Sequence, residues 1–265
     1  MWAMGQHAAG IAQARDVRLT QSTVAVAGLD PRLDNFTILH ISDLHLGSLA
    51  GVAEAAKAAV AGAKADLCVL TGDYAPRYNA PPDRVIAAMQ PILAEVTSRH
   101  GVYLTLGNYD SARLARALRL KQDWKLLIDQ RVTLDHDGAA IDLLGLDDPF
   151  EQPQGPMLTA LQQAADGFRI VLAHAPDLAA EAAAAGAHLY LCGHTHGGQI
   201  CLPGGRPVFA NSRRPDLVRG LWREGSMLGY TTSGAGASGI PRRHNCPPEV
   251  ALLRLRAEPQ RPVGG

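Results

Sequence analysis

The chain of 265 residues is long enough to bury a sizeable hydrophobic core without cross-links. Its 25 Lys and Arg residues balance 25 Asp and Glu residues, and the resulting net charge of zero argues against long nucleic acid as a partner. The four cysteines form no CxxC pair, which argues against a Cys-based zinc site. No apolar run reaches about 18 residues, which argues against a transmembrane helix in this sequence.

Residues 1–14 are rich in small side chains, but they lack the basic start and the continuous apolar stretch of a signal peptide. We therefore expect a cytoplasmic protein. Peripheral contact with the inner membrane stays open as an alternative, because a basic amphipathic segment occurs later in the chain. The sequence does not indicate an oligomeric state.

From residue 36 onward, short apolar runs alternate with alanine-rich helical stretches, which is the pattern of βα units around a largely parallel sheet. The expected strands are residues 36–42, 66–70, 102–106, 140–144, 169–173 and 188–192. The expected helices are residues 52–64, 82–99, a segment after Tyr109, 157–165 and 176–185.

The last third of the chain changes character. After Gln199 it is rich in Gly, Pro and β-forming residues, with apolar runs at 200–202, 227–232 and 250–255. These runs predict antiparallel strands that form a second sheet. The expected fold class is α/β, with two sheets and helices outside them. No internal repeat or sharp break divides the chain, so we expect one domain over residues 1–265, with a core of about 36–257 and frayed ends.

Polar side chains follow the ends of several predicted strands. Asp43 and His45 follow the first strand in ISDLH, and Asp73 follows the second in LTGD. The series continues with Asn108 in LGN, His174 in VLAHAPD, and His194 and His196 in CGHTHGG. Ligands collect at the carboxyl ends of strands in α/β sheets, so we expect these side chains to converge on one edge.

This ligand set contains two carboxylates, one amide oxygen and four imidazoles, and no thiolate. Such a set suits Mn, Fe, Zn or Co better than Mg or Ca alone. Seven ligands are too many for one tetrahedral ion, whereas two ions about 3.5–4 Å apart that share a carboxylate would use all of them. The sequence therefore predicts two divalent metal ions, with manganese as the first expectation.

Each motif also has an ordinary structural explanation. Asp-x-His after a strand is usually a surface loop or a helix cap, GD and GN pairs are mostly turns, and a single His is more often hydrogen-bonded in a core. The occurrence of all these motifs at successive strand ends favours the metal site over coincidence.

From about residue 36 to residue 255 the chain resembles the calcineurin-like metallophosphoesterase superfamily. The resemblance rests on five blocks: Asp43-x-His45, Gly72-Asp73, Gly107-Asn108-x-Asp110, His174 and Gly193-His194-Thr195-His196. The later half, with GHTHGGQI and HNCPPEVALLRL, is similar to the bacterial branch that includes YkuE-type phosphoesterases. The resemblance implies a four-layer αββα sandwich of two mixed β-sheets flanked by helices.

The resemblance also implies a ligand set for each ion, with Asp73 as the bridge between them. One ion would take Asp43, His45, Asp73 and His196, and the other would take Asp73, Asn108, His174 and His194. A hydroxide bridging the two ions would attack phosphorus in line with the leaving group. The implied enzyme is a dinuclear-metal-dependent hydrolase of phosphoester or phosphoanhydride bonds.

One position departs from the superfamily pattern. Most members have Gly-Asn-His-Asp or Gly-Asn-His-Glu, in which the His protonates the leaving oxygen, whereas the expected catalytic block here is Asn108, Tyr109 and Asp110. Tyrosine, with a pKa near 10, transfers a proton less readily than an imidazolium. A phosphate leaving group, with a second pKa of about 6, needs little protonation, so Tyr109 favours anhydride substrates.

A second resemblance leads to a specific substrate. The UDP-2,3-diacylglucosamine pyrophosphatases of the lipid A pathway include members that also lack this His. The leading substrate is therefore UDP-2,3-diacylglucosamine, a nucleotide-linked glycolipid, cleaved to UMP and the acylated sugar 1-phosphate. A general or cyclic-nucleotide phosphodiesterase acting on another phosphorylated small molecule is the second candidate. A non-catalytic metal-binding scaffold is the third, although every ligand position is filled here.

Residues 111–130 repeat apolar side chains at helical spacing beside basic ones. A membrane-facing or acyl-binding helix is one interpretation, and a helix that packs on the sheet with a solvated basic face is the favoured one. Arg242, Arg243 and His244 either reach a phosphate or form an ordinary charged loop.

Overall fold

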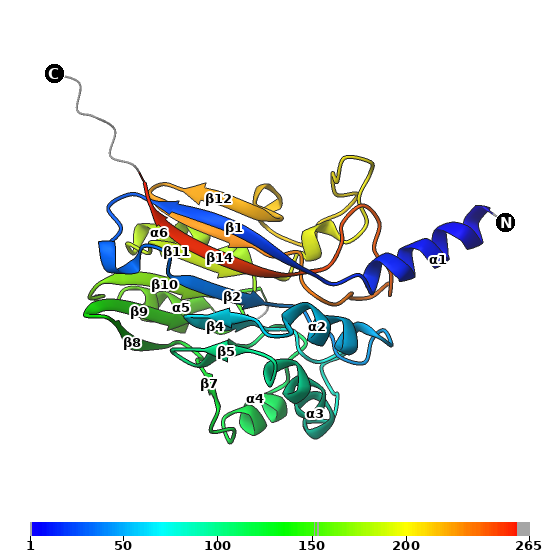
Figure 1. Ribbon diagram of the computed structural model, residues 1–265, viewed down its shortest axis with the longest axis horizontal. Coiled ribbons are helices and arrows are strands. Elements are labelled where there is room, and N and C mark those ends of the chain that lie inside the picture. The colour runs from blue at the N-terminus through cyan, green and yellow to red at the C-terminus, as the bar shows by residue number, and fades with distance from the viewer. Residues whose placement is uncertain (1, 151, 153, 259–265) are drawn as a thin grey trace.

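Two six-stranded β-sheets lie face to face in the computed structural model, which describes residues 2–150, 152 and 154–258. Helices cover the outer face of each sheet (Figure 1). This is the four-layer αββα arrangement of two mixed sheets that the motifs implied, so the predicted fold class is confirmed.

The first sheet has the strand order β1-β14-β2-β4-β6-β7. Its strands β2, β4, β6 and β7 run parallel, while β14 runs antiparallel to β2 and parallel to β1. The bounds are β1 (Arg18–Val26), β2 (Thr37–Ile41), β4 (Leu67–Thr71), β6 (Val102–Thr105), β7 (Trp124–Leu126) and β14 (Glu249–Ala257).

The second sheet has the order β12-β13-β11-β10-β9-β8. Its four middle strands are parallel, and the edge strands β12 and β8 are antiparallel to their neighbours. The bounds are β8 (Gln130–His136), β9 (Ala139–Gly145), β10 (Phe168–Leu172), β11 (Leu189–Cys192), β12 (Gly220–Glu224) and β13 (Met227–Thr231).

Helices α2 (Val52–Val60), α3 (Pro82–Leu93) and α4 (Ala112–Leu118) cover the first sheet, and α5 (Gln154–Leu161) and α6 (Ala179–Ala184) cover the second. Helix α1 (Trp2–Ala14) extends from the body at the N-terminal end (Figure 1). Short elements connect these: β3 (Lys64–Ala65), β5 (Thr97–Ser98), and the 3-10 turns Pro31–Leu33, Pro176–Leu178, His196–Gly198 and Pro215–Leu217. No helix among the described residues has the length and apolar character needed to cross a membrane.

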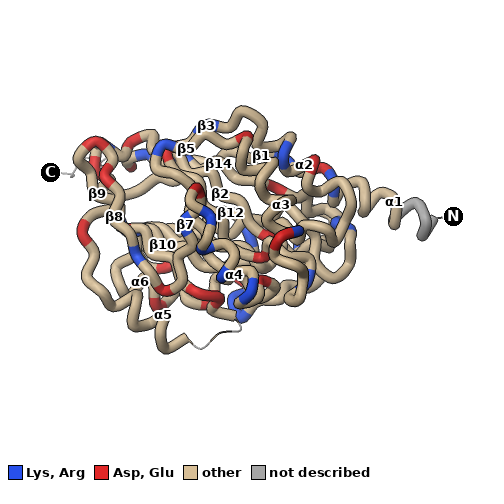
Figure 2. The backbone as a smooth tube through the Cα atoms, turned by 90° about the horizontal axis from the view of Figure 1, so that it is seen from below, with Lys and Arg blue, Asp and Glu red and all other residues tan. Residues whose placement is uncertain are grey.

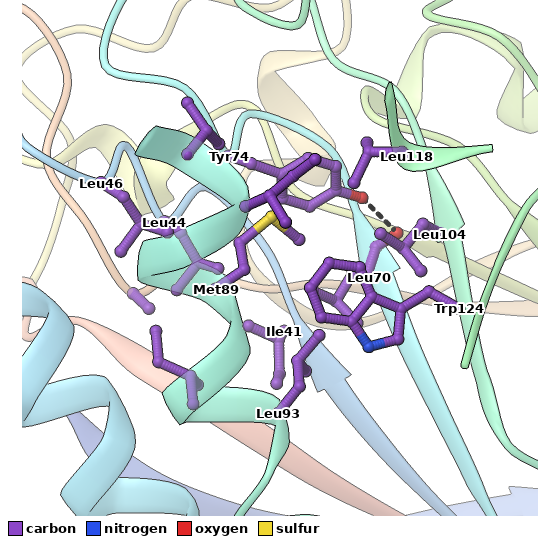
Figure 3. Close-up of a cluster of buried hydrophobic side chains, with 14 of the residues drawn as sticks. Ile41, Leu44, Leu46, Leu70, Tyr74, Met89, Leu93, Leu104, Leu118 and Trp124 are labelled. Carbon is purple, nitrogen blue, oxygen red and sulfur yellow. Dashed lines mark hydrogen bonds between the residues drawn. The ribbon is translucent and has the colours of Figure 1, made fainter. Parts of the chain in front are cut away.

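Each layer boundary holds its own buried apolar cluster. Under α3, Met89 and Leu93 follow one another at helical spacing and meet Ile41 and Leu70 of the sheet (Figure 3). Tyr74 is buried in the same cluster, where its hydroxyl donates to the carbonyl oxygen of Leu70. Strands buried on both faces read as continuous apolar runs, which is why the central strands could be predicted within one or two residues.

The predicted assignment of strands to sheets was wrong in part. We expected the last third to form the second sheet, but β14 lies inside the first sheet, between β1 and β2. Of the late strands, β13 joins the second sheet parallel to β11 rather than antiparallel. The body of that sheet consists of β8 to β11, three of which we had expected beside β2 and β4. Strand pairing is a long-range property that local patterns do not encode.

The helix expected over residues 111–130 is also wrong beyond its first turns. Helix α4 ends at Leu118, and Trp124 and Leu126 lie in β7, paired beside β6. Both side chains are buried while Lys125 between them is exposed, which is the alternation of a strand. Leu114 and Leu118 of α4 pack into the core, so the favoured interpretation of a helix packed on the sheet holds for residues 112–118.

Strand β1 was not expected, because the predicted core began at about residue 36. It pairs with β14 from Arg18 to Val26, and Val24 and Val26 are buried. Most of its other side chains are polar and at least partly exposed, as is common on an edge strand, so no clear apolar run marked it.

Candidate metal centre

The seven predicted ligands lie where strand ends of both sheets meet. In the first sheet, Asp43 and His45 follow β2, Asp73 follows β4, and Asn108 follows β6. In the second sheet, His174 follows β10, while His194 and His196 follow β11. The structure thus brings all of them to one edge of the sandwich, where two groups of side chains offer ligand atoms within 4.8 Å of one another: Asp43, His45 and His196, and Asp43, Asp73 and His174.

Asp73 is at the middle of this cluster. Its Oδ2 atom lies 3.4 Å from Nε2 of His45 and 3.4 Å from Nε2 of His174. Its other oxygen, Oδ1, accepts a hydrogen bond of 2.8 Å from the backbone N–H of Tyr109. The carboxylate is therefore oriented so that one oxygen faces imidazoles from both halves of the site.

Each of the remaining imidazoles, His196 and His194, faces one of these two histidines. Nε2 of His196 lies 3.1 Å from Nε2 of His45 and 3.5 Å from Oδ1 of Asp43. Nδ1 of His194 lies 3.1 Å from Nε2 of His174. Two ring nitrogens at this separation repel through their lone pairs unless a proton or a cation lies between them. Such pairs fit the ligand atoms of a shared cation.

Asn108 supplies the amide of the predicted set. Its Oδ1 atom is buried and has no hydrogen-bond partner within the described chain. A buried polar oxygen normally has a partner, because leaving it unpaired costs about 1–3 kcal/mol. With its neighbours it completes a set of carboxylate, amide and imidazole donors, which fits two divalent transition-metal ions.

The backbone is unusual at five of the seven positions. Asp43, His45, Asp73, His194 and His196 have left-handed φ angles between 40° and 67°. Such conformations cost about 1–3 kcal/mol each for residues other than glycine, and they cluster at functional sites. Here the strained turns aim the five side chains inward from the strand ends.

Two glycines let the strand-end loops approach one another. A Cβ atom on Gly107 would lie 2.4 Å from Oδ1 of Asp73, and one on Gly193 would lie 2.2 Å from Oδ2 of Asp43. Because real side chains do not approach so closely, any larger residue at either position would push a carboxylate out of the cluster.

The buried carboxylates of the cluster stabilise positive charge placed beside them, as the pKa values of the side chains indicate. Burial alone would raise the pKa of Asp73, but the nearby His174 and His45 lower it to about 2, so this carboxylate is ionised at neutral pH. Burial also opposes charge on His174, yet Asp73 and Asp43 raise its pKa above the usual value. Burial, followed by the effect of His174, lowers the pKa of His194 to about 3, which keeps this imidazole neutral with a free lone pair.

Asp110, expected in the catalytic block, lies behind the ligands. Its carboxylate accepts hydrogen bonds from the backbone N–H groups of Asp73 (2.7 Å), Tyr74 (3.0 Å), Gly107 (3.0 Å) and Ala75 (3.2 Å). Burial, followed by repulsion from Asp73, raises the pKa of Asp110 to about 7. These contacts tie the loop after β4 to the loop after β6.

Arg243 also lies behind the cluster and not in the pocket. It is fully buried, and its guanidinium donates to the carbonyl oxygens of Ser233 (2.6 Å), Gly236 (2.7 Å) and His196 (3.2 Å). Of the two earlier interpretations of residues 242–244, contact with a phosphate is therefore wrong for Arg243. It holds the segment after β13 against the His196 turn.

Tyr109 lines an open pocket of about 680 Å³ in front of the cluster, together with Asp73, Asn108, His194 and His196. Its ring meets the His45 ring edge-on at 5.0 Å, and its hydroxyl accepts a hydrogen bond of 3.3 Å from Oγ of Ser238. The phenol is thus held beside the predicted ligands.

Sequence reasoning missed Gln199 and Phe150. The Gln199 side chain accepts from the backbone N–H of Ser238 and donates to the carbonyl oxygens of Ser238 and Ile240, each at 2.9 Å. The Phe150 ring packs 4.3 Å from the His194 ring. The position of Gln199 directly after GHTHGG was a signal that we left unused, whereas nothing local marked Phe150.

Comparison with known proteins gives a family. The model of the calcineurin-like phosphoesterase family matches residues 36–198, which is more than half of the chain, and all seven predicted ligands lie within this range. The metallophosphoesterase YkuE of Bacillus subtilis, described as uncharacterized, is 26% identical over 248 residues, which are 91% of this chain and 86% of that protein.

Two further relatives have functional names. Phosphodiesterase YaeI of Escherichia coli is 29% identical over 228 residues, covering 83% of this chain and 82% of that protein. UDP-2,3-diacylglucosamine pyrophosphatase LpxG of Chlamydia trachomatis is 33% identical over 147 residues, covering 51% of this chain and 43% of that protein. Among solved structures, sulfate thiohydrolase SoxB of Thermus thermophilus overlaps with a TM-score of 0.46 and 15% identity, over 86% of this chain and 57% of that chain.

Proposed function

Because this chain belongs to the calcineurin-like phosphoesterase family, and is therefore a metal-dependent hydrolase of phosphorus-containing bonds, we propose that the cluster around Asp73 is its catalytic centre. One ion would be held by Asp43, His45, Asp73 and His196, and the other by Asp73, Asn108, His174 and His194. Manganese is the metal that we would supply first, because the donors mix hard oxygen with imidazole nitrogen.

One observation supports this proposal above the others. Oδ2 of Asp73 lies 3.4 Å from an imidazole nitrogen on each side, one from His45 and one from His174. A carboxylate oxygen between two groups of nitrogen donors is the arrangement that a bridging ligand of two cations requires.

The bound ions would supply an activated water and neutralise the nonbridging phosphate oxygens. The protein residues hold and orient the reactants. Asp110 fixes the loops that carry Asp73 and Asn108, and Arg243 fixes the turn that carries His196. Tyr109 lines the pocket, and its hydroxyl, which accepts from Ser238, would donate a hydrogen bond to the leaving oxygen.

Tyr109 also supports a choice of substrate. Since a phenol is a weaker proton donor than an imidazolium, the site favours a leaving group that needs little protonation, such as a phosphate. We propose a phosphoanhydride substrate, with UDP-2,3-diacylglucosamine first, and the partial similarity to LpxG supports this choice. General phosphodiester hydrolysis is the second candidate, which the longer match to YaeI favours. A non-catalytic scaffold is the third.

The formation of UMP and of p-nitrophenol from two compounds would test the substrate. Purified full-length protein with Mn(II) is given UDP-2,3-diacylglucosamine and, separately, bis-p-nitrophenyl phosphate, each with a chelator-treated control. We expect rapid UMP formation, while the diester, whose p-nitrophenolate also leaves without a proton, reports on the metal centre alone. A fast diester rate without UMP would move the assignment to a phosphodiesterase, and no turnover of either compound by metal-loaded protein would support the scaffold.

The ligand assignment needs a separate test. We expect His194→Ala to lower kcat by more than about 100-fold and to reduce the bound metal, because one ion loses a donor. His7→Ala is a matched control, since His7 is exposed on α1. Full metal content and activity in His194→Ala would contradict the assignment.

A further inference from the structure

Two unlike sets of residues line the pocket in front of the metal cluster. Asp73, His194 and His196 belong to the predicted ligand set. The same pocket is lined by Phe150, Ile200, Val208, Phe209 and Ile240, which we call the apolar wall. A molecule whose phosphorus atom reaches the cluster through this pocket can therefore contact the apolar wall as well.

The apolar wall is poorly covered by the protein itself. Val208 is 63% exposed, Phe209 is 73% exposed and Ile240 is 49% exposed. Among the described residues, eight large apolar side chains are exposed. These three line one pocket, and a fourth, Leu202, lies in the segment between Ile200 and Val208. Exposed apolar residues gathered in this way usually mark a binding surface, whereas scattered ones do not.

The wall is fixed relative to the metal cluster. The segment from Ile200 to Val208 folds back on itself, since the N–H of Leu202 donates to Arg206 (2.8 Å) and the N–H of Val208 donates to Ile200 (3.0 Å). Ile240 is held by the Gln199 side chain, which follows the His196 turn directly. A wall with a fixed position holds the bound molecule in one orientation relative to the metal cluster.

A second pocket of about 380 Å³ lies on the other side of Asn108, which lines both pockets. It is mixed in polarity and in charge, since Arg116, Arg119 and Asp147 line it beside Leu106 and Ile128. Figure 2 shows basic residues along α4 with acidic residues beside them. The charged side chains thus gather in the second pocket, and the exposed apolar ones in the first.

We infer that the apolar wall binds the aliphatic part of an amphiphilic substrate, so that the enzyme acts on lipid-linked phosphoesters or phosphoanhydrides in preference to soluble nucleotides. This inference rests on the proposed function, because the same site must hold the phosphorus atom. Contacts made far from the reacting bond raise kcat/KM when they are kept in the transition state.

A series of p-nitrophenyl alkyl phosphodiesters, from methyl to octyl, tests the wall directly. The full chain is loaded with Mn(II), and each ester is used below the concentration at which it aggregates. We expect kcat/KM to rise about fourfold for each methylene that becomes fully buried and to level off where the wall ends.

Variants connect this dependence to the wall. Phe209→Ser and Ile240→Ser should each lower the octyl-to-methyl ratio of kcat/KM several-fold. Leu221→Ser is the matched control, because Leu221 is 46% exposed on β12 and does not line the pocket. It should keep the ratio of the unchanged protein.

The outcomes separate the inference from the function on which it rests. Turnover of all esters at one rate would overturn the apolar wall and leave the hydrolase. No turnover of any ester, together with no UMP from UDP-2,3-diacylglucosamine, by metal-loaded protein would overturn the proposed function itself. A flat series together with cosedimentation on vesicles of phosphatidylcholine and phosphatidylglycerol would place a bilayer against the wall, which also overturns the inference.

Discussion

Tyr109 occupies the position at which most of the superfamily carries histidine, and its hydroxyl is held by Ser238 in the pocket. We expect Tyr109→His to raise kcat/KM by about 100-fold for diesters with alkoxide leaving groups, because general acid catalysis contributes about 10²–10⁴-fold. Esters of p-nitrophenol should change far less, since p-nitrophenolate leaves without a proton. Rates across a series of leaving-group pKa values provide the measurement, and an equal change for both classes would contradict this role.

His40 makes the fold sensitive to acid. Burial lowers its pKa to about 3, against about 6.5 for histidine in an unfolded chain. Below pH 6.5 the unfolded chain therefore binds a proton that the folded protein does not, and stability falls as the pH drops towards 3. At pH 5.5 this costs about 1.4 kcal/mol.

Urea unfolding between pH 5 and 8, in the presence of a chelator, would show the effect of His40. His40→Asn should give a flatter dependence of the unfolding free energy on pH than the unchanged protein. Its absolute stability is not the readout, because the variant also changes the 2.8 Å contact with Oγ1 of Thr71. Parallel pH profiles would rule out His40 as the acid-sensitive group.

For single residues, the sequence predicted which positions carry candidate ligands better than it predicted which groups a side chain contacts. Asp73 and His174 stood out because each polar residue interrupts the end of an apolar run, which is a local pattern. The role of Arg243 depends on carbonyl groups at Ser233, Gly236 and His196, and these meet only after the chain folds. No spacing in the sequence could distinguish that buried arginine from one that faces a phosphate.

Among the elements, α4 and β7 show why a periodic pattern is ambiguous. Ala117, Leu120 and Trp124 fit a helical repeat in the sequence, yet the helix ends at Leu118 and the chain extends at Trp124. Three residues of a strand are too few to establish a period of two. What decides the structure is the free edge of β6, which β7 pairs with.

The end of β9 must come very close to the opposite sheet. A Cβ atom on Gly145 would lie 2.3 Å from Cβ of Leu127 and 3.0 Å from Cγ2 of Thr105. We expect Gly145→Ala to lower the unfolding free energy by about 1–3 kcal/mol, because overpacking shifts neighbouring backbone. Chemical denaturation would measure this change. Gly155→Ala on α5 is the matched control, since nothing lies within 4 Å there, and an equal loss in both variants would contradict the explanation.

At the scale of the whole molecule, the predicted ligands come from both sheets: Asp43, His45, Asp73 and Asn108 from the first, and His174, His194 and His196 from the second. Bound ions would therefore connect the two halves of the sandwich. We expect saturating Mn(II) to raise the unfolding free energy by about 4 kcal/mol when free metal is 1,000 times its Kd.

Thermal unfolding with Mn(II) and after chelation would measure this coupling. His194→Ala should show a smaller increase in Tm with metal than the unchanged protein. An identical increase in both proteins would indicate metal bound elsewhere.

The layer order could be anticipated from the family resemblance, but the division of strands between the sheets could not, because it depends on pairs such as β1 with β14 that are far apart in sequence.

The place of β14 has a consequence for how the protein is made. This strand lies between β1 and β2, and β1 pairs along its whole length with β14 alone. During translation, β1 leaves the ribosome early and has no neighbour in its sheet until residues 249–257 have been synthesised. Until then the nascent chain carries two open strand edges, which are sites of misassembly. Completion of the first sheet therefore waits for the synthesis of β14, and a ribosome that stalls before Glu249 would leave β1 and β2 without the strand that joins them.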